Sequence, residues 1–336
     1  MTTNRKIVLA SRPAGPATEE NFRLEESPIP DPAEGEFTVK IHYLSVDPYM
    51  RGRMNDSRSY AAPVQIGEVM TGGAVGTVIA SKSSKYTVGD VVQGQFGWQE
   101  YAISNGAGTR KVDASLAPIS TSLGILGMPG LTAYFGLLDI CDPKPGETVV
   151  VSGAAGAVGS YVGQIAKIKG CKTVGIAGTD DKVKHLVDDL GYAVAYNYRT
   201  VENHYKKLRE LCPDGIDVYF DNVGGAITDA VLMQLNVHAR VGICGQISQY
   251  NNAKPEMGPR LLGMLIVARA KVQGFLVSDY APRFAEGLQA MAVWMRDGKL
   301  QYREQFEEGI ENAPKAFLGL LEGKNTGKQL VRISAE

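Results

Sequence analysis

An alternation of strand-like and helix-like segments between residues 148 and 248 constrains the fold of this chain more than any other feature. The segments follow one another as TVVVSG (148–153), a helix at 158–170, KTVGIAG (172–178), a helix at 180–191, AVAYNY (193–198), a helix at 201–215, IDVYFDN (216–222), a helix at 226–239 and RVGICGQIS (240–248). Helical crossovers of this length join parallel strands and cover both faces of one sheet. The sequence therefore predicts a doubly wound parallel α/β sheet, followed by a further helix at 284–300.

Residues 1 to about 125 show a different sequence pattern. They are rich in glycine and proline, and short β-like runs such as FTVKIHYLSV, GGAVGTVIAS and DVVQGQFGWQEYAI are separated by turn residues. With 336 residues the chain also exceeds the usual size of a single domain. We therefore expect a β-rich, irregular domain ahead of the α/β domain.

The segment VSGAAGAVGS, residues 151–160, lies directly after the first apolar strand and opens a helix. Backbone N–H groups and the positive end of the helix dipole converge at such a turn, which makes it suitable for a phosphate. In the AxGxxG pattern, Gly156 lets the backbone approach a pyrophosphate and Gly159 permits close packing of helix on strand. The alternative is a tight turn that uses glycine for packing alone. The strand, the helix and the βα units that follow favour dinucleotide binding.

The end of the second strand predicts which dinucleotide binds. Sites selective for NAD place a carboxylate there, which accepts hydrogen bonds from the adenosine ribose. Here the strand ends in AGT (177–179), and small residues admit a 2′-phosphate that Lys182 reaches as a point charge. Asp180 and Asp181 suit the first turn of the following helix, where the dipole stabilises acids. NADP is therefore favoured, and the alternative for Lys182 is a solvated helix face.

Composition excludes several classes of partner. The 35 basic and 36 acidic residues are interleaved, so no basic patch predicts binding to nucleic acid or to an anionic membrane. The four cysteines form no CxxC pair, which argues against a disulfide framework and fits a reducing compartment. The N-terminus has too few apolar residues for a signal peptide, and the most apolar later run is interrupted by Arg269 and Lys271. We expect a cytoplasmic protein without a membrane span.

Several motifs occur in one order along the chain, namely AAGAVG, GTDDK, YNYRT, FDNVGG, CGQISQYN, QGFLV and KNTGK. In this order they closely resemble the zinc-independent medium-chain dehydrogenase/reductases, specifically the prostaglandin reductase and leukotriene B4 dehydrogenase group. LSVDPYMRGRM and LGMPGLTAYFGLLDI resemble bacterial curcumin reductase and the plant alkenal double-bond reductases of that group. The resemblance implies an NADPH-dependent reductase of the carbon–carbon double bond in α,β-unsaturated ketones and aldehydes, and it implies a homodimer.

The resemblance also implies the domain arrangement and the cofactor contacts. A Rossmann domain at 126–299 would be inserted in a β-rich, GroES-like substrate domain made of 1–125 and 300–336. The residues implied to contact the cofactor are Gly156, Ala157, Val158, Gly159, Lys182, Tyr198, Asn222, Cys244, Gly245, Ile247, Ser248, Tyr250, Phe275, Leu276, Val277, Asn325, Met128 and Thr132. The first four would hold the pyrophosphate, Lys182 and Tyr198 the 2′-phosphate, and 244–250 with 275–277 the nicotinamide half. Core packing is the alternative for Met128.

Zinc-dependent relatives of this group carry an early cysteine, a GHE motif and a lobe with four cysteines, which together supply zinc ligands. In this chain Ser45 takes the place of the cysteine, IGEV at 66–69 takes the place of GHE, and the lobe is absent. The four histidines show no spacing typical of metal ligands. The sequence therefore predicts no metal.

Reduction of an enone without a metal requires a hydrogen-bond donor for the oxygen on which charge develops. Tyr250, in SQYN, follows the fifth strand at the edge where doubly wound folds bind ligands. Its phenol would either donate to the enolate oxygen or protonate the α-carbon, with packing as the alternative. By resemblance, Tyr49 in DPYMR is a second candidate that would place the substrate, with an aromatic wall as the alternative. Arg51 and Arg53 suit either an acidic substrate tail or a solvated or salt-bridged role.

Two other functions stay open at this point. A quinone reductase shares the fold and the cofactor but reduces a carbonyl system. A nucleotide-binding protein of the same superfamily would bind NADPH without turnover. The balanced charge and the context of Tyr250 favour the enone and enal reductase over both.

Overall fold

The computed structural model describes residues 3–29 and 31–336, and these form two compact units. The first unit comprises the described part of Met1–Leu123 with Glu304–Asn325 and Gln329–Glu336, and the second comprises Gly124–Arg303 with Thr326–Lys328. The structure thus divides the chain after residues 123 and 303, where the sequence places the divisions after 125 and 299. The assignment of Thr326–Lys328 to the second unit is not foreseen by the sequence.

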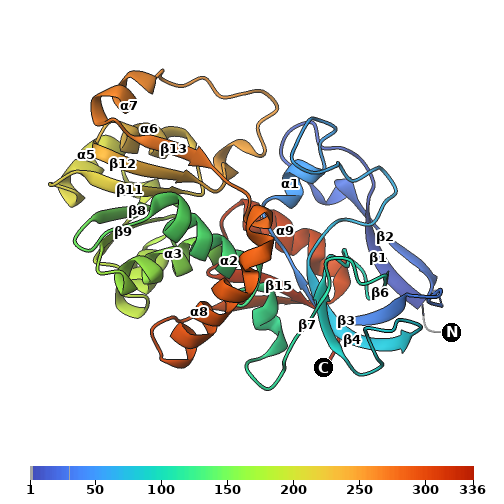
Figure 1. Cartoon of the computed structure of the whole chain (residues 1–336). Coiled ribbons are helices and arrows are strands. Elements are labelled where there is room, and N and C mark those ends of the chain that lie inside the picture. Colours follow the sequence, from blue (N-terminus) through green and yellow to red (C-terminus); the bar gives the residue numbers. More distant parts are fainter. Residues whose placement is uncertain (1–2, 30) are drawn as a thin grey trace. The chain divides into compact units, whose positions relative to one another are not determined.

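The second unit contains a parallel sheet of six strands in the order β10-β9-β8-β11-β12-β13 (Figure 1). The strands are β8 (Thr148–Val151), β9 (Lys172–Ala177), β10 (Val194–Asn197), β11 (Ile216–Asp221), β12 (Leu235–Ile243) and β13 (Lys271–Gly274). The helices are α2 (Met128–Phe135), α3 (Ala157–Ile168), α4 (Asp180–Lys184), α5 (His204–Leu211), α6 (Gly225–Leu232), α7 (Leu262–Ala268) and α8 (Phe284–Arg296). The doubly wound parallel fold predicted from the alternation of strands and helices is confirmed.

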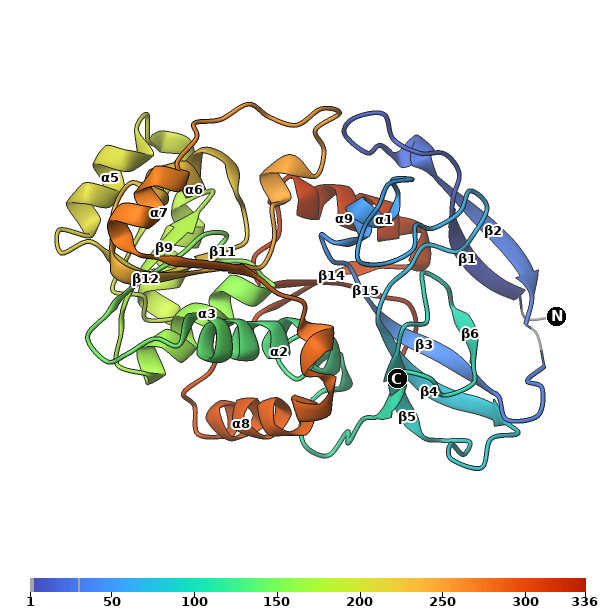
Figure 2. The same ribbon diagram turned by 45° about the horizontal axis from the view of Figure 1, so that its top comes forward.

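Helices cover both faces of this sheet, and alternate residues of one strand show why. Val149 and Val151 of β8 belong to the core formed with α2, α3 and α8, whereas Val150 belongs to the core formed with α5 and α6. Figure 2 shows the two helical layers on opposite sides of the strands. A strand buried on both faces must be apolar at every position, which explains the continuous run TVVV. The strand order reverses between β8 and β11, and the carboxyl ends of these two strands therefore flank the expected ligand crevice.

The predicted helix at 226–239 is only partly correct. Helix α6 ends at Leu232, and β12 already begins at Leu235. The segment LNVHARVGI pairs with β11 on one side and with β13 on the other, with a register shift and a positive φ of 65° at His238. Pairing within the sheet therefore overrides the helical pattern of this segment.

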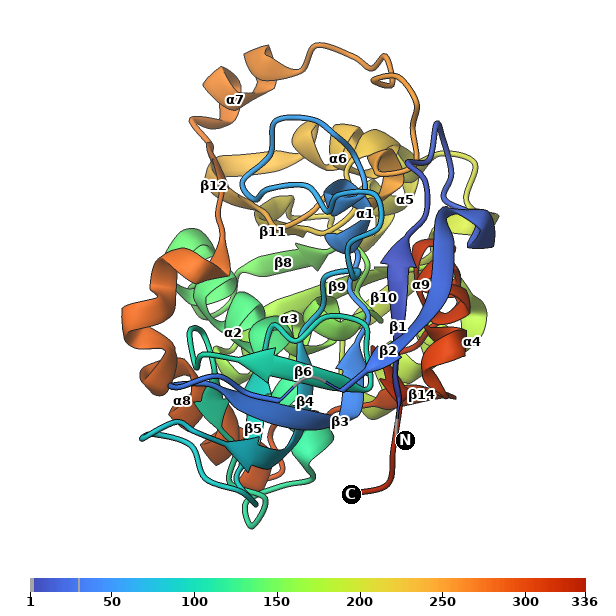
Figure 3. The ribbon, with the colours of Figure 1, turned by 90° about the vertical axis from the view of Figure 1, so that its right-hand side faces the viewer.

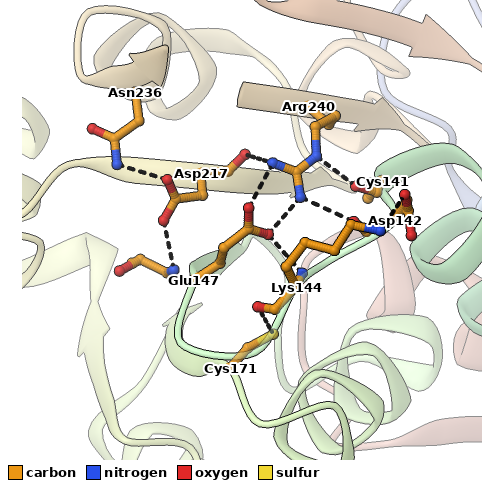
Figure 4. Close-up of polar contacts among 9 residues, drawn as sticks. Cys141, Asp142, Lys144, Glu147, Cys171, Asp217, Asn236 and Arg240 are labelled. Carbon is orange, nitrogen blue, oxygen red and sulfur yellow. Dashed lines mark hydrogen bonds and ion pairs between the residues drawn. The ribbon is translucent and has the colours of Figure 1, made fainter. Parts of the chain in front are cut away.

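An ion-pair network joins Arg240 of β12 to Glu147, which directly precedes β8 at the amino edge of the sheet (Figure 4). The guanidinium of Arg240 donates to Glu147 Oε1 at 3.0 Å and Oε2 at 2.5 Å, to Cys141 O at 2.8 Å and to Asp142 O at 3.0 Å. The side chains of Arg240 and Glu147 are 19% and 21% exposed. Because both side chains of this bidentate pair are largely shielded from solvent, the pair fixes β12 to the turn before β8.

Replacing Arg240 with alanine should lower the free energy of unfolding by about 2–3 kcal/mol, because Glu147 loses its bidentate partner in a largely dry position. Lys144→Ala is the matched control. Its ammonium contacts Asp142 in a pair whose side chains are 60% and 64% exposed, and its loss should cost less than about 0.5 kcal/mol. Urea denaturation of both variants measures the difference, and equal effects would contradict the assignment.

The first unit is built on antiparallel strands. Its strands are β1 (Thr3–Leu9), β2 (Phe22–Pro28), β3 (Phe37–Ser45), β4 (Ala74–Ser81), β5 (Val91–Gly94), β6 (Tyr101–Ser104), β7 (Arg110–Lys111), β14 (Glu304–Glu308) and β15 (Lys328–Arg332), with helices α1 (Met50–Arg53) and α9 (Ala313–Leu321). Strands β3, β4 and β5 lie side by side in the larger sheet, and β1 pairs with β2 (Figure 3). Strand β15 pairs with β3, so the end of the chain completes a sheet begun near its start.

The predicted β-like run at 90–103 is two strands rather than one. Strands β5 and β6 are separated by a loop in which Phe96 and Trp98 are buried in the core of the first unit. Trp98 stacks on Phe22 with ring centroids 5.6 Å apart. These aromatic side chains give the irregular loop the apolar character that the sequence pattern shares with a strand. Across residues 3–29 and 31–336, no helix is both long and apolar enough to cross a membrane.

Candidate active site

The turn after β8 is closed by glycine. Helix α3 begins at Ala157, and Gly156 precedes it with extended backbone angles. A Cβ atom added at Gly159 would lie 2.4 Å from Gly153 O and 2.7 Å from Ala154 Cα. Those neighbours are backbone atoms, so only glycine lets α3 pack this closely on the turn. The free N–H groups at the start of this twelve-residue helix carry the partial positive charge that suits a phosphate.

A segment from the far end of the chain joins this turn. The N–H of Gly327 donates to Ala155 O at 2.8 Å, and Gly327 forms a parallel bridge with Gly156. Gly327 has a φ of 72°, which favours glycine at this position. Asn325, which is buried, directly precedes this segment in the chain. Residues 326–328 of the KNTGK motif and the glycine turn are therefore parts of one structure.

The ends of β8 and β11 are held together by side-chain hydrogen bonds. The Asn222 amide donates from Nδ2 to Ser152 O at 2.8 Å, and its backbone N–H donates to Ser152 Oγ at 2.9 Å. A Cβ atom added at Gly153 would lie 3.4 Å from Asn222 Cβ. Asn222 thus lies at the topological switch point, next to the glycine turn.

Two cationic side chains lie near the end of β9. Thr179 caps α4 by accepting a hydrogen bond from the Lys182 N–H at 3.3 Å, and the Lys182 side chain is half-buried. The guanidinium of Arg199 lies 5.7 Å from the ring centre of Tyr198, and a Cβ atom at Gly178 would lie 3.1 Å from that ring and 3.5 Å from Arg199 Nε. Burial, followed by the charge of Arg199, lowers the pKa of Lys182. Two positive charges at the end of β9 favour binding of an anion there.

Arg199 is a residue that the sequence analysis missed. It stands in the quoted motif YNYRT directly after Tyr198. A second cation next to an expected phosphate contact could have identified Arg199 from the sequence. Arg199 lies with Tyr198 in the short turn at 198–200. Asp180, in the first turn of α4, accepts a hydrogen bond from Asn197 Nδ2 at 2.8 Å.

The loop after β12 is hydrogen-bonded to the end of β11. The N–H groups of Cys244 and Gly245 donate to Asp221 O at 2.8 and 3.0 Å. Further along, Ile247 N–H donates to Asn222 O at 3.3 Å, and the Ser248 hydroxyl donates to Val223 O at 2.6 Å. The predicted stretch at 244–250 is therefore a single ordered loop at the carboxyl edge of the sheet.

Two side chains of this loop differ in the chemistry they offer. Burial raises the pKa of the Cys244 thiol to about 12, so it stays neutral and is a poor nucleophile. Tyr250 is half-buried, and its phenol oxygen accepts a hydrogen bond from the Gln246 N–H at 3.2 Å. A Cβ atom at Gly245 would lie 3.2 Å from this oxygen, so the loop passes close beneath the phenol.

The remaining predicted cofactor contacts of the second unit lie on α2 and after β13. Phe275 packs edge-on against Phe220 with ring centroids 6.1 Å apart, and it precedes Leu276 and Val277 in the turn that leaves the sheet. Met128 is 37% exposed, and the buried Thr132 hydroxyl donates to Met128 O at 2.7 Å. The exposure of Met128 is more than core packing alone would give.

Tyr49 lies in the first unit, where its ring packs against the core. Burial raises the pKa of its phenol, which therefore stays protonated. The guanidinium of Arg51 is buried and donates to Gly15 O at 2.6 Å and Asn55 Oδ1 at 2.7 Å. Arg53 donates to Ala62 O at 2.5 Å. Both arginines therefore contribute to the structure of the loops around α1.

Metal ligands do not gather anywhere in the described part of the chain. Among residues 3–29 and 31–336, no group of three His, Cys, Asp or Glu side chains is placed to hold a metal ion. Ser45, at the position where the resemblance places a zinc cysteine, donates its hydroxyl to Asp47.

Comparison with known proteins gives matches over nearly the whole chain. The family described as the N-terminal domain of oxidoreductase matches residues 5–112, and the family described as zinc-binding dehydrogenase matches residues 157–293. NADPH-dependent curcumin reductase of Escherichia coli is 47% identical over 338 residues, which cover 99% of this chain and 98% of that protein. The NADP-dependent 2-alkenal reductase of Nicotiana tabacum is 41% identical over 340 residues, with the same coverage. The crystal structure of CurA from Vibrio vulnificus in complex with NADPH superimposes with a TM-score of 0.95 at 49% identity, covering 99% of this chain and 100% of that one.

Proposed function

The chain belongs to the medium-chain dehydrogenase/reductase family of NADP-dependent oxidoreductases, and we propose that it reduces the carbon–carbon double bond of α,β-unsaturated ketones and aldehydes with NADPH. The observation that carries the proposal is the convergence of three loops at one edge of the sheet. The glycine turn contacts Asn222, and Asn222 in turn accepts a hydrogen bond from the loop that carries Tyr250. The glycine turn and the loop that carries the phenol of Tyr250 are thus neighbours at the switch point.

The residues present fit this cofactor. The turn at 153–156 and the start of α3 would hold the pyrophosphate, because a Cβ atom added at Gly156 would meet only the backbone oxygen of Gly153, at 3.2 Å. Lys182, Tyr198 and Arg199 would hold the 2′-phosphate. The loop at 244–250, with the turn at 275–277, would line the nicotinamide half.

Lys182 and Arg199 give a prediction on cofactor choice. Replacing either with alanine should weaken NADPH binding about 10- to 50-fold, because each removes a charge-assisted hydrogen bond to a dianion. NADH, which lacks the 2′-phosphate, should bind within about twofold of the wild type. Fluorescence titration with both nucleotides measures this, with the exposed Lys184→Ala on the same helix as the control. Equal losses for NADPH and NADH would overturn the assignment.

In the proposed reaction NADPH, when bound, supplies a hydride to the β-carbon of the substrate. Negative charge then develops on the carbonyl oxygen of the substrate, and a preorganised donor lowers the free energy of that state. The phenol of Tyr250 is that donor, and a proton taken from solvent, either directly or through the phenol of Tyr250, adds to the α-carbon and completes the saturated product. Tyr49, held protonated by burial, is proposed to place the substrate.

The test of the proposal is the rate of NADPH and NADH oxidation with trans-2-nonenal, 3-nonen-2-one, curcumin and 1,4-benzoquinone, with each product identified by mass. We expect saturated ketones or aldehydes carrying two added hydrogens, and a strong preference for NADPH. Turnover of the quinone alone would indicate that the protein is a quinone reductase. NADPH binding without turnover of any acceptor would indicate a binding protein.

We further propose that the enzyme is a homodimer formed through the edge strand β13. This strand closes one end of the sheet, and Val272 on it is 42% exposed. Helix α7, which precedes it, exposes Leu262, Ile266 and Val267 by 67–79%. An open strand edge beside an apolar helix face favours pairing with a second copy, which would extend the sheet and cover the helix.

Sedimentation equilibrium tests the dimer. The wild type should have twice the mass of one chain, and Ile266→Asp should shift the equilibrium toward the monomer because a carboxylate would be buried at the interface. Val88→Asp is the control, since Val88 is 66% exposed in the first unit. A monomeric wild type, or a dimer that tolerates Ile266→Asp, would contradict this interface.

The cytoplasm is the proposed location. All four cysteines are free thiols in the structure, and Cys141 and Cys212 are buried. Free thiols of this kind are typical of proteins in a reducing compartment.

A further inference from the structure

The side chain of Asp221, the last residue of β11, is fully buried at the switch point. Its carboxylate accepts six hydrogen bonds. The donors to Oδ1 are Ser152 Oγ at 3.0 Å, Tyr219 OH at 2.9 Å, Val223 N at 2.9 Å and Gly224 N at 2.9 Å, and the donors to Oδ2 are Thr228 Oγ1 at 2.6 Å and Gln246 Nε2 at 3.1 Å. All six donors are uncharged, so the buried side chain is held by directed hydrogen bonds alone.

Five of these donors come from the residue after β8, from β11 itself, from the turn before α6 and from α6, whereas the sixth comes from the loop that carries Tyr250. Gln246 is the only one of the six that lies on this loop. Its side chain fits tightly, since a Cβ atom at Gly224 would lie 2.1 Å from Gln246 Oε1. Asp221 therefore fixes the position of Gln246 through the side chain, in addition to the hydrogen bonds that its backbone carbonyl accepts from Cys244 N–H and Gly245 N–H.

Gln246 in turn contacts the phenol. Its backbone N–H donates to Tyr250 OH at 3.2 Å. A hydrogen bond accepted by the phenol oxygen stabilises negative charge on that oxygen and makes the O–H a stronger donor. The side chain of Gln246 is anchored on Asp221 while its N–H meets the phenol, so one residue joins the buried carboxylate to the proposed catalytic group.

We infer that Asp221 and Gln246 are positioning residues that hold the loop at 244–250 so that the phenol of Tyr250 is oriented and polarised for the reaction. The inference rests on the proposed function in so far as it predicts rates. The placement of the phenol itself does not depend on any reaction.

Gln246→Met is the decisive variant, because it keeps the length of the side chain and removes the amide, which donates to Asp221 Oδ2 at 3.1 Å and also to Gly245 O at 3.1 Å. Its matched control is Thr228→Val, which removes the other donor to the same carboxylate oxygen from a helix that does not carry Tyr250. We expect Gln246→Met to lower kcat about tenfold with little change in the affinity for NADPH, because a small displacement of a catalytic group costs rate rather than binding. Thr228→Val should leave kcat within about twofold of the wild type. It should lower the free energy of unfolding by about as much as Gln246→Met does, because each variant removes one donor to the same carboxylate oxygen. In the Tyr250→Phe background, Gln246→Met should change kcat by less than about twofold.

A second readout is independent of activity. In protein labelled with 13C at Cζ of tyrosine, the signal of Tyr250 is assigned by its loss in Tyr250→Phe. This signal should move in Gln246→Met and stay in place in Thr228→Val, since the shift reports the hydrogen bond at the phenol oxygen. An unmoved signal in Gln246→Met, or equal shifts in both variants, would overturn the inference whatever the rates. A moved signal in an enzyme whose Tyr250→Phe variant is fully active would uphold the positioning and contradict the catalytic role of Tyr250.

Discussion

Replacing Tyr250 with phenylalanine is expected to lower kcat by about 100-fold, the usual loss when one donor to a developing negative charge is removed. The ring of phenylalanine fills the same volume, so the loop at 244–250 keeps its hydrogen bonds to β11 and to Asn222. The affinity for NADPH should therefore stay within about twofold of the wild type, which separates a loss in the chemical step from a loss in binding. Steady-state rates with 3-nonen-2-one at saturating NADPH, together with fluorescence titration of the cofactor, measure both quantities.

Tyr205→Phe is the matched control for this experiment. Tyr205 is 37% exposed on α5, a helix that does not carry the loop at 244–250, and loses the same hydroxyl. Its kcat should equal that of the wild type. A Tyr250→Phe enzyme with full kcat would reduce this tyrosine to a packing role, and the donor would have to be sought elsewhere.

Replacing Gly159 with alanine is expected to weaken NADPH binding by at least about 100-fold, because the turn that would hold the pyrophosphate must move. The added Cβ would lie 2.4 Å from Gly153 O, and a backbone oxygen cannot rotate away as a side chain can. A shift of the turn would also disturb the bond from Gly327 N–H to Ala155 O. Calorimetric titration with NADPH gives the affinity, and thermal unfolding shows whether the fold survives.

The control for this change is Gly319→Ala in helix α9, where the nearest atom to an added Cβ lies 3.8 Å away. That substitution should stabilise the protein by up to about 1 kcal/mol, because alanine is the better helix former. Wild-type affinity for NADPH in Gly159→Ala would show that the cofactor phosphates do not use this turn.

The sequence predicts the second unit better than the first, and the reason lies in the kinds of signal involved. The strands of a doubly wound sheet are buried on both faces, so TVVV and the strands after it show continuous apolar character. The β-rich first unit has partly exposed strands, and some of its loop residues, such as Trp98, are buried. Hydrophobicity along the sequence therefore does not separate strands from loops in this unit. The helix predicted at 226–239 fails for a related reason, because the pairing of β12 with two neighbours overrides the local pattern.

The sequence by itself determined the parallel α/β sheet, the glycine turn that opens α3 and the absence of an acid at the end of β9, because each depends on residues close together in the chain. The tertiary structure alone decided that the charge of Arg199 acts on Lys182, that Gly327 bonds to the glycine turn, and that Asp221 anchors the side chain of Gln246. Ser152 and Asp221, which meet at 3.0 Å, are separated by 69 positions in the chain. Periodicity reports which face of an element is buried, but it carries no information on which distant side chains meet once the strands are in register.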